Sequence, residues 1–202
     1  LQARELVRIA ARDLDGGSLA ETGRSLSVLA LLLIELITDR ALAERTAAWG
    51  EPTAADGTRL RLCVLALGKA GGAEMGYASD VDVIFIADGE GTCTSPDGRE
   101  REASRLFKFI AQDVTRHCDD HRLYEIDPRL RPWGEQGPLV VTLPALERYW
   151  QEPREVWERL AMVRLGYAGG DEHLAAEAIR LIHRGAISSP LPDDAAEQVR
   201  DM

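Results

Sequence analysis

Two aspartates open an apolar run near the middle of the chain. Asp80 and Asp82 begin DVDVIFIA (residues 80–87), which otherwise has the β-branched composition of a buried strand. Alternate side chains of a strand point to opposite faces, so both carboxylates should share one face while the intervening valines and Phe85 face packed helices. Carboxylates on one face repel each other, and the usual compensation is a divalent cation with oxygen ligands. The spacing therefore suggests a metal site.

A third carboxylate ends another apolar stretch. Asp127 follows LYEI in LYEIDPRLRP, at a point where a core strand needs no charge. If the strand continues, the side chain of Arg129 lies on the same face as Asp127. Arg131 could reach the same site where the strand ends. Arginines hold phosphate oxygens in a fork, and metal ions held by carboxylates can activate an attacking oxygen and stabilise a leaving one. These residue types predict metal-assisted nucleotidyl transfer.

The connection GKAGG, at residues 68–72, is rich in glycine. Such a loop lets backbone N–H groups approach a triphosphate closely. Lys69 either touches phosphate or is a solvated loop lysine. The stretch is not a P-loop, because no Lys-Ser or Lys-Thr follows its final glycine.

A structural interpretation competes with the catalytic one. An isolated Asp-X-Asp pair often marks a solvated or salt-bridged strand end. The glycine-rich loop one strand earlier and Asp127 one strand later favour the metal site instead. Arg129 and Arg131 remain open, since either could be a structural partner of Asp127 or Glu125.

Periodicity predicts the elements that must position these residues. Helices are expected over residues 1–14, 18–48 (as one helix or two), 100–119, 144–167 with an interruption near Pro153, and 171–184. Strands are expected over residues 61–68, 80–87 and 122–126, and loops over residues 50–57 and 88–98. The predicted fold class is α/β (α+β), a small mixed sheet with helices behind it. We expect a helical flank at 1–57, a catalytic core at 58–168 and the start of a further helical region at 169–202.

Composition narrows the functional classes. The 202 residues carry a formal net charge of −10, which disfavours general nucleic-acid binding through a basic surface. The longest early apolar run, residues 28–34, is far too short to span a membrane, and no signal peptide is evident. The three cysteines form no Cys-X-X-Cys pair and no disulfide framework, so a reducing cytoplasm is expected.

Three stretches together resemble a known family. They are LGKAGGAEMGYASDVDVIF, LYEIDPRLRPWGEQGPLV and VWERLAMVR, in this order. Over about residues 60–170 the chain resembles the glutamine synthetase adenylyltransferases, members of the polymerase-β-like nucleotidyltransferase superfamily. Such enzymes carry two catalytic units. One transfers AMP from ATP to a tyrosine of glutamine synthetase, and the other removes it by phosphorolysis, releasing ADP. A chain of 202 residues would hold one unit, which suggests a fragment.

The resemblance implies roles for individual residues. The metal ligands for Mg²⁺ or Mn²⁺ would be Asp80, Asp82 and Asp127, which are also the catalytic residues. The residues that bind ATP would be Gly68, Lys69, Gly71, Gly72, Ser79, Arg129 and Arg131. The implied protein substrate is glutamine synthetase, and a PII signal protein and glutamine would set the balance of the two activities through the full-length chain.

The motifs divide between the two units. EMGYASD and LYEIDPRLRP favour the attaching unit, whereas GPLV, ALERYWQ and WERLAMVR favour the removing unit. Our preferred interpretation is the attaching unit. The rivals are the removing unit, a nucleotidyltransferase for a small molecule or a nucleic-acid end, and a regulatory nucleotide-binding unit without turnover. The intact aspartates argue against the last of these.

Overall fold

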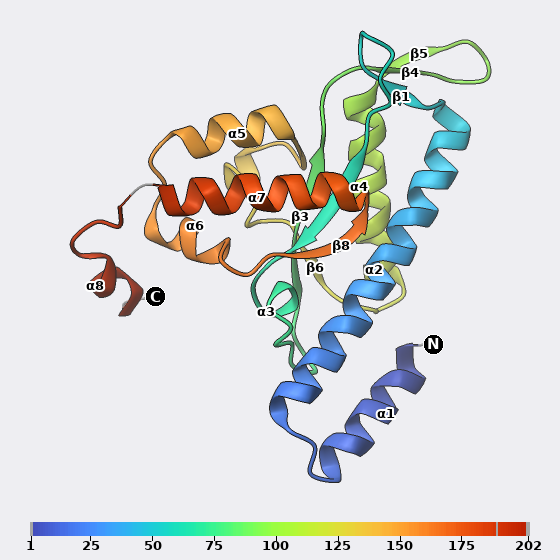
Figure 1. Ribbon diagram of the computed structural model, residues 1–202. Coiled ribbons are helices and arrows are strands. Elements are labelled where there is room, and N and C mark those ends of the chain that lie inside the picture. Colours follow the sequence, from blue (N-terminus) through green and yellow to red (C-terminus); the bar gives the residue numbers. More distant parts are fainter. Residues whose placement is uncertain (1, 189, 201–202) are drawn as a thin grey trace.

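In the computed structural model, which describes residues 2–188 and 190–200, a five-stranded sheet lies between two layers of helices (Figure 1). The helices are α1 (Gln2–Leu14), α2 (Leu19–Trp49), α3 (Gly68–Gly71), α4 (Ala103–Asp120), α5 (Leu143–Gln151), α6 (Val156–Ala161), α7 (Glu172–Ser188) and α8 (Ala195–Arg200), with a 3-10 turn at Gly134–Gln136. The strands are β1 (Pro52–Thr53), β2 (Leu62–Ala66), β3 (Val81–Ala87), β4 (Thr92–Thr94), β5 (Glu100–Glu102), β6 (Ile126–Asp127), β7 (Val140–Thr142) and β8 (Gly166–Gly170). The predicted α/β class with a small mixed sheet is confirmed.

Strand β3 is the centre of the main sheet, whose order is β6-β3-β2-β8. On one side β3 pairs antiparallel with β2, which in turn pairs antiparallel with β8. On its other side β3 pairs in parallel with two short strands, first with β6 near its start and then with β7 near its end. The chain between β6 and β7 therefore leaves the sheet and returns to it beside the same strand.

Alternation along β3 divides the core into two parts. Val83 and Phe85 pack with residues of α2 and α4 on one face, and Ile84 and Ile86 pack with residues of α5 and α7 on the other. All four side chains are buried. The expected helices behind the sheet are thus present, and the structure adds a second helical layer across the opposite face (Figure 1).

The long helix α2 runs along one edge of the molecule, with α1 folded back beside its first half (Figure 1). Its start is fixed by a capping box between Ser18 and Glu21, which satisfies free N–H groups of the first turn. Arg45 joins α2 to α4 by two hydrogen bonds to Asp113, one of them 2.8 Å long between Nη2 and Oδ1. The helix ends at Trp49 and is capped by Gly50, where a Cβ atom would lie 2.0 Å from the carbonyl oxygen of Thr94.

Several expected elements were wrong. The helix expected to run to about residue 167 ends at Ala161, and β8 follows it. The loops expected at 50–57 and 88–98 contain β1 and β4, which pair with each other in a small sheet with β5. The strand expected over 122–126 is the two-residue strand β6, and β7 was not expected at all. These short strands are defined by their partners, because pairing rather than local sequence orders them.

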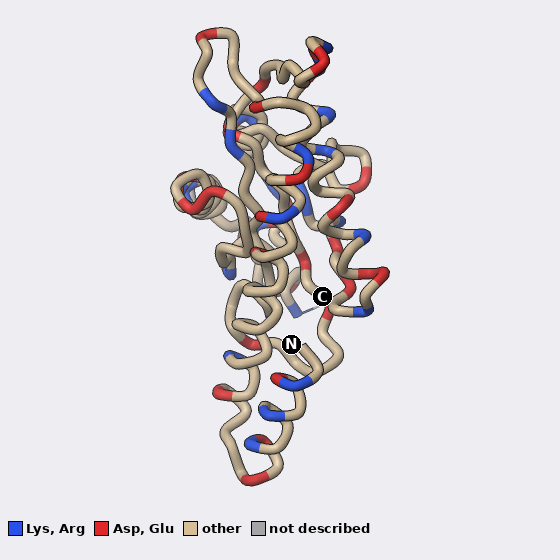
Figure 2. The backbone as a smooth tube through the Cα atoms, turned by 90° about the vertical axis from the view of Figure 1, so that its right-hand side faces the viewer, with Lys and Arg blue, Asp and Glu red and all other residues tan. Residues whose placement is uncertain are grey.

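Charge is spread over the whole molecule. Figure 2 shows acidic and basic residues interspersed from one end of the backbone to the other, in keeping with the high proportion of both signs in the sequence. Within the described residues, no helix has both the length and the apolar character that a membrane crossing requires.

Close packing of β8 on α2 gives a stability prediction. A Cβ atom added at Gly169 would lie 2.9 Å from Thr38 Oγ1 and 3.1 Å from the Cα atom of Glu35. Gly169→Ala should therefore lower the free energy of unfolding by about 2 kcal/mol, since α2 cannot move without disturbing its contacts with α4. Thermal or urea unfolding measures the change. Gly76→Ala is the control, because its nearest neighbour would be Ser79 Oγ at 3.5 Å, and equal effects of the two variants would refute the packing argument.

Candidate active site

Three carboxylates converge where β3 begins. One oxygen of each of Asp80, Asp82 and Asp127 lies within 4.8 Å of the others. The parallel pairing of β3 with β6 sets Asp82 opposite Asp127 and so brings together residues 45 positions apart in the chain. Asp80 lies two residues before Asp82 and shares its side of the strand. The three side chains expected from the sequence to form one group are therefore neighbours in space.

The backbone around these aspartates is fixed on both sides. The carbonyl oxygen of Asp82 accepts a hydrogen bond of 2.9 Å from the N–H of Leu67, and the N–H of Val81 donates one of 2.9 Å to Glu125. Helix α4 ends in a tight turn, in which Arg122 takes a φ of 49° and Leu123 donates a 2.9 Å hydrogen bond to the carbonyl of Cys118. This turn sends the chain back toward β3 and sets the register of β6.

The environments of two paired aspartates differ. Burial, and then the charges of Asp80 and Asp127, raise the pKa of Asp82 above its ordinary value, while Arg129 and Lys69 oppose this shift. By contrast, the hydrogen bond from the Arg129 side chain lowers the pKa of Asp127. The negative charge of Asp82 is thus the less compensated of the two.

Arg129 forms a fork on Asp127. Its Nε donates a 2.8 Å hydrogen bond to Oδ2, its Nη2 donates one of 2.5 Å to the same oxygen, and its backbone N–H donates one of 2.8 Å to Oδ1. Asp127 is buried, whereas two thirds of the Arg129 side chain (67%) is exposed. The sequence left open whether Arg129 binds phosphate or is a structural partner of an acidic residue. This geometry favours a structural role as the partner of Asp127.

Arg131 is engaged with its own loop. Its Nη1 donates a 2.8 Å hydrogen bond to the carbonyl of Pro128, and its Nη2 donates one of 3.3 Å to the carbonyl of Gly137. These bonds fold the chain that leaves the sheet after β6 and returns at β7. Arg131 therefore shapes the loop that carries Arg129, while its buried Nε has no hydrogen-bond partner among the described residues.

The glycines of the 68–72 stretch serve different purposes. Gly68 has a φ of 57°, and a Cβ atom there would lie 3.3 Å from Asp82 Oδ2, so its backbone borders the carboxylates. A Cβ at Gly71 would lie 2.5 Å from the carbonyl oxygen of Ala66, and one at Gly72 would lie 2.6 Å from Arg164 Cδ. Gly71 is therefore required for close backbone packing whether or not a nucleotide binds, while a side chain at Gly72 would displace the Arg164 side chain.

Two other residues with expected nucleotide roles flank the carboxylates. Lys69 is exposed, and it is close enough to Asp82 for its charge to lower the pKa of that carboxyl. The Ser79 hydroxyl accepts a 2.9 Å hydrogen bond from the N–H of Gly76 and so closes the turn that leads to Asp80. The structure thus gives Ser79 a role in shaping the loop.

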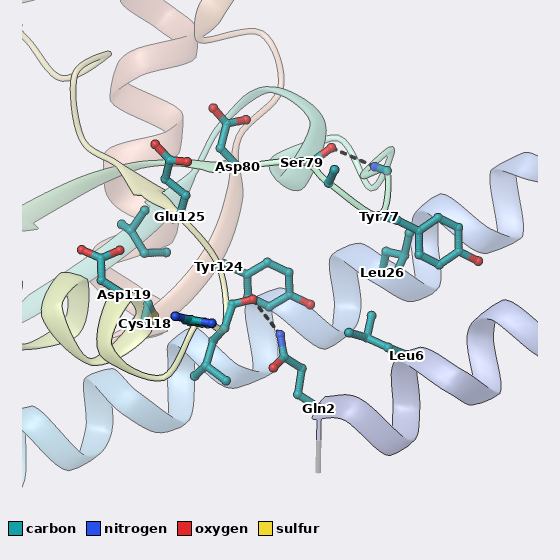
Figure 3. A pocket seen from close by; sticks show the side chains of 15 residues that line it. Gln2, Leu6, Leu26, Tyr77, Ser79, Asp80, Cys118, Asp119, Tyr124 and Glu125 are labelled. Carbon is teal, nitrogen blue, oxygen red and sulfur yellow. Dashed lines mark hydrogen bonds between the residues drawn. The ribbon is translucent and has the colours of Figure 1, made fainter.

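A pocket of 770 Å³ that the sequence did not indicate lies beside Asp80 (Figure 3). Helix α1 contributes Gln2 and Leu6 to it, and the chain before β6 contributes Tyr124. The Tyr124 hydroxyl is buried, and burial raises its pKa while the neighbouring Gln2 side chain opposes that shift. Neither periodicity nor motif spacing signals this pocket, because its walls meet only when α1 folds back on α2.

One comparison with known proteins identifies the family. A family model described as glutamate-ammonia ligase adenylyltransferase matches residues 1–180, a span that includes α1, the three carboxylates and the return of the chain at β8. The chain belongs to the glutamate-ammonia ligase adenylyltransferase family. The resemblance stated above is thereby confirmed. Members of this family are adenylyltransferases, and their protein substrate, glutamate-ammonia ligase, is glutamine synthetase.

The acidic cluster fits the divalent metal ion that an adenylyltransferase of this family uses with ATP. Mg²⁺ and Mn²⁺ favour carboxylate oxygens, and the cluster offers three within 4.8 Å. The raised pKa of Asp82 shows that its charge lacks full compensation, which a cation would supply. Asp80, Asp82 and Asp127 are the residues that would hold it.

The fork on Asp127 gives a direct prediction. In Arg129→Gln the pKa of Asp127 should rise, because burial and the nearby carboxylates would no longer be opposed by the guanidinium. Side-chain carboxyl ¹³C NMR titration of the metal-free protein measures this pKa. Arg129→Lys keeps the charge without the fork and should give a smaller rise. An Asp127 pKa that is the same in all three proteins would mean that the fork does not form in solution.

Proposed function

We propose that this chain is an adenylyltransferase unit that transfers AMP from ATP to a tyrosine hydroxyl of glutamine synthetase, with Mg²⁺ or Mn²⁺ held by Asp80, Asp82 and Asp127. The observation that carries this proposal is the convergence of these three carboxylates, within 4.8 Å, in a chain matched to the family over residues 1–180. When bound, the metal would orient the reactants in line and offset the charge that develops on the phosphate.

The protein's own residues would bind and orient the nucleotide. The backbone of Gly68 borders Asp82 without a side chain in the way, and Lys69 brings a positive charge to the same place. The pocket of 770 Å³ beside Asp80 has a size typical of small-ligand sites. We propose that it takes the nucleoside part of ATP, with the buried Tyr124 hydroxyl as a hydrogen-bonding group.

The tyrosine hydroxyl must lose its proton as its oxygen attacks the α-phosphorus of ATP and displaces pyrophosphate. Asp127 is near the reacting centre, but the hydrogen bond from Arg129 lowers its pKa and makes it a weak proton acceptor. While the fork is closed, therefore, we assign Asp127 chiefly to metal binding. Help with deprotonation would require Arg129 to move away first.

Metal binding can be tested without any turnover. Titration with Mn²⁺ in a calorimeter should show binding to the unmutated chain, and the affinity should fall by at least roughly tenfold in Asp80→Asn/Asp82→Asn, because two anionic ligands are lost. Asp193→Asn/Asp194→Asn removes the same charge from an exposed pair near the C-terminal end and should bind as the unmutated chain does. Equal affinities for the two double variants would rule out the proposed metal site.

The direction of the reaction is decided by intact mass. Glutamine synthetase incubated with the chain, ATP and Mg²⁺ should gain one AMP per subunit, and Asp127→Asn should abolish this gain while leaving the fold intact by circular dichroism. The alternative is the removing unit, favoured by GPLV, ALERYWQ and WERLAMVR. In that case adenylylated glutamine synthetase would instead lose AMP in the presence of phosphate, with release of ADP. Full activity of Asp127→Asn would refute the assignment of this carboxylate. Control by a PII protein is part of the same proposal.

A further inference from the structure

A second hollow, of 660 Å³, includes Arg129 in its lining, and its charged residues are mostly cations. One wall is the beginning of α4, and the other is the loop between β6 and β7. Its charged lining residues are Arg105, Lys108, Arg129 and Arg131, with Glu135 as the acidic member. We call this hollow the basic groove. In a chain with a net charge of −10, a local excess of positive charge needs a specific reason.

The α4 wall carries the free positive charges. The side chains of Arg105 and Lys108 are exposed, and neither makes a hydrogen bond or an ion pair with any residue that the structure describes. Arg129 and Arg131, in contrast, are engaged with Asp127 and with loop carbonyls. A ligand of the basic groove would therefore meet two flexible cations on the helix first.

The groove is elongated rather than compact. The α4 residues that line it run from Ser104 to Gln112, which at a rise of about 1.5 Å per residue is roughly 12 Å. An extended peptide covers that length with about four residues. The opposite wall adds apolar surface from Pro138, Leu139 and Val140. A row of cations facing an apolar wall suits an extended acidic peptide better than a single phosphate, which needs several donors converging on one point.

We propose that the basic groove binds an extended acidic segment of the protein substrate next to its target tyrosine. The inference rests on the proposed function, because it assumes that the acceptor is a protein. Arg129 lies in both the groove and the fork on Asp127, so a segment seated along α4 places its neighbouring residue at the carboxylates. The groove thus supplies the contact with an acidic substrate segment. The carboxylate cluster cannot supply it, because it is itself negatively charged.

Binding of a labelled peptide tests the groove directly. The probe is a fluorescent peptide with one tyrosine beside a run of glutamates, and its control has glutamines in place of the glutamates. Fluorescence anisotropy should show salt-sensitive binding of the acidic peptide and weaker binding of the neutral one. Arg105→Gln/Lys108→Gln should weaken the acidic peptide roughly tenfold. Arg180→Gln/Arg184→Gln is the matched control, since it removes the same charge from exposed positions of α7 in the other helical layer.

The same two double variants are then compared with glutamine synthetase as substrate. The groove variant should raise the KM for glutamine synthetase and leave the KM for ATP and the turnover at saturation unchanged. Equal binding of the two peptides, or equal behaviour of the two double variants, would overturn the proposal. The proposal would also be overturned if the groove variant lost affinity for inorganic pyrophosphate but not for the acidic peptide. The groove would then be a phosphate site.

The two proposals fail in different ways. Binding of the acidic peptide could depend on Arg105 and Lys108 while the chain neither adds AMP to glutamine synthetase nor removes it. In that case the groove proposal is supported and the proposed function is wrong. Alternatively, glutamine synthetase could be modified normally while the acidic peptide binds the groove variant and the unmutated chain with equal affinity. In that case only the groove proposal is wrong.

Discussion

The parallel pairing of β6 with β3 is the constraint on which the site depends. Two residue pairs make up this contact, and one of them is Asp82 with Asp127. At an effective dielectric constant of about 20, two carboxylates about 5 Å apart repel by roughly 3 kcal/mol, a large share of the roughly 5–15 kcal/mol by which a domain is stable. The pairing can persist only because other parts of the fold hold the strands in place.

The support comes from residues that do not touch the carboxylates. Strand β2 is buried along its whole length and braces β3 on one side, while the two helical layers enclose both faces. The return of the chain after α4, through the left-handed Arg122, delivers β6 to the other side. Arg129 then neutralises one of the carboxylates, at Asp127, and the repulsion left at Asp82 is what makes the cluster suited to a cation.

The parts of the site that were predictable are those encoded locally. The Asp-X-Asp spacing and the apolar alternation of β3 lie within one short stretch, and Asp127 ends an apolar run that is visible by itself. Strand β8 was not predictable, because GYAGG has a glycine-rich composition that is unfavourable for strands. Its conformation follows from pairing with β2 and from the close approach of α2, both of which are long-range contacts. The same limit explains why sequence treated Gly68, Gly71 and Gly72 as one group, although only Gly68 borders the carboxylates.

Arg129 stands between two regions of opposite charge. On one side its guanidinium is bonded to a buried carboxylate, and on the other its exposed surface lines the basic groove. A change at Arg129 would alter the charge balance of both regions at once, so loss of activity in such a variant could not be assigned to either. Arg105 and Lys108 lack this ambiguity, because they line the groove from α4 and are not among the charges that shift the pKa of Asp82 or Asp127. Substitutions on α4 can therefore change the proposed substrate surface while leaving the proposed metal site of Asp80, Asp82 and Asp127 intact.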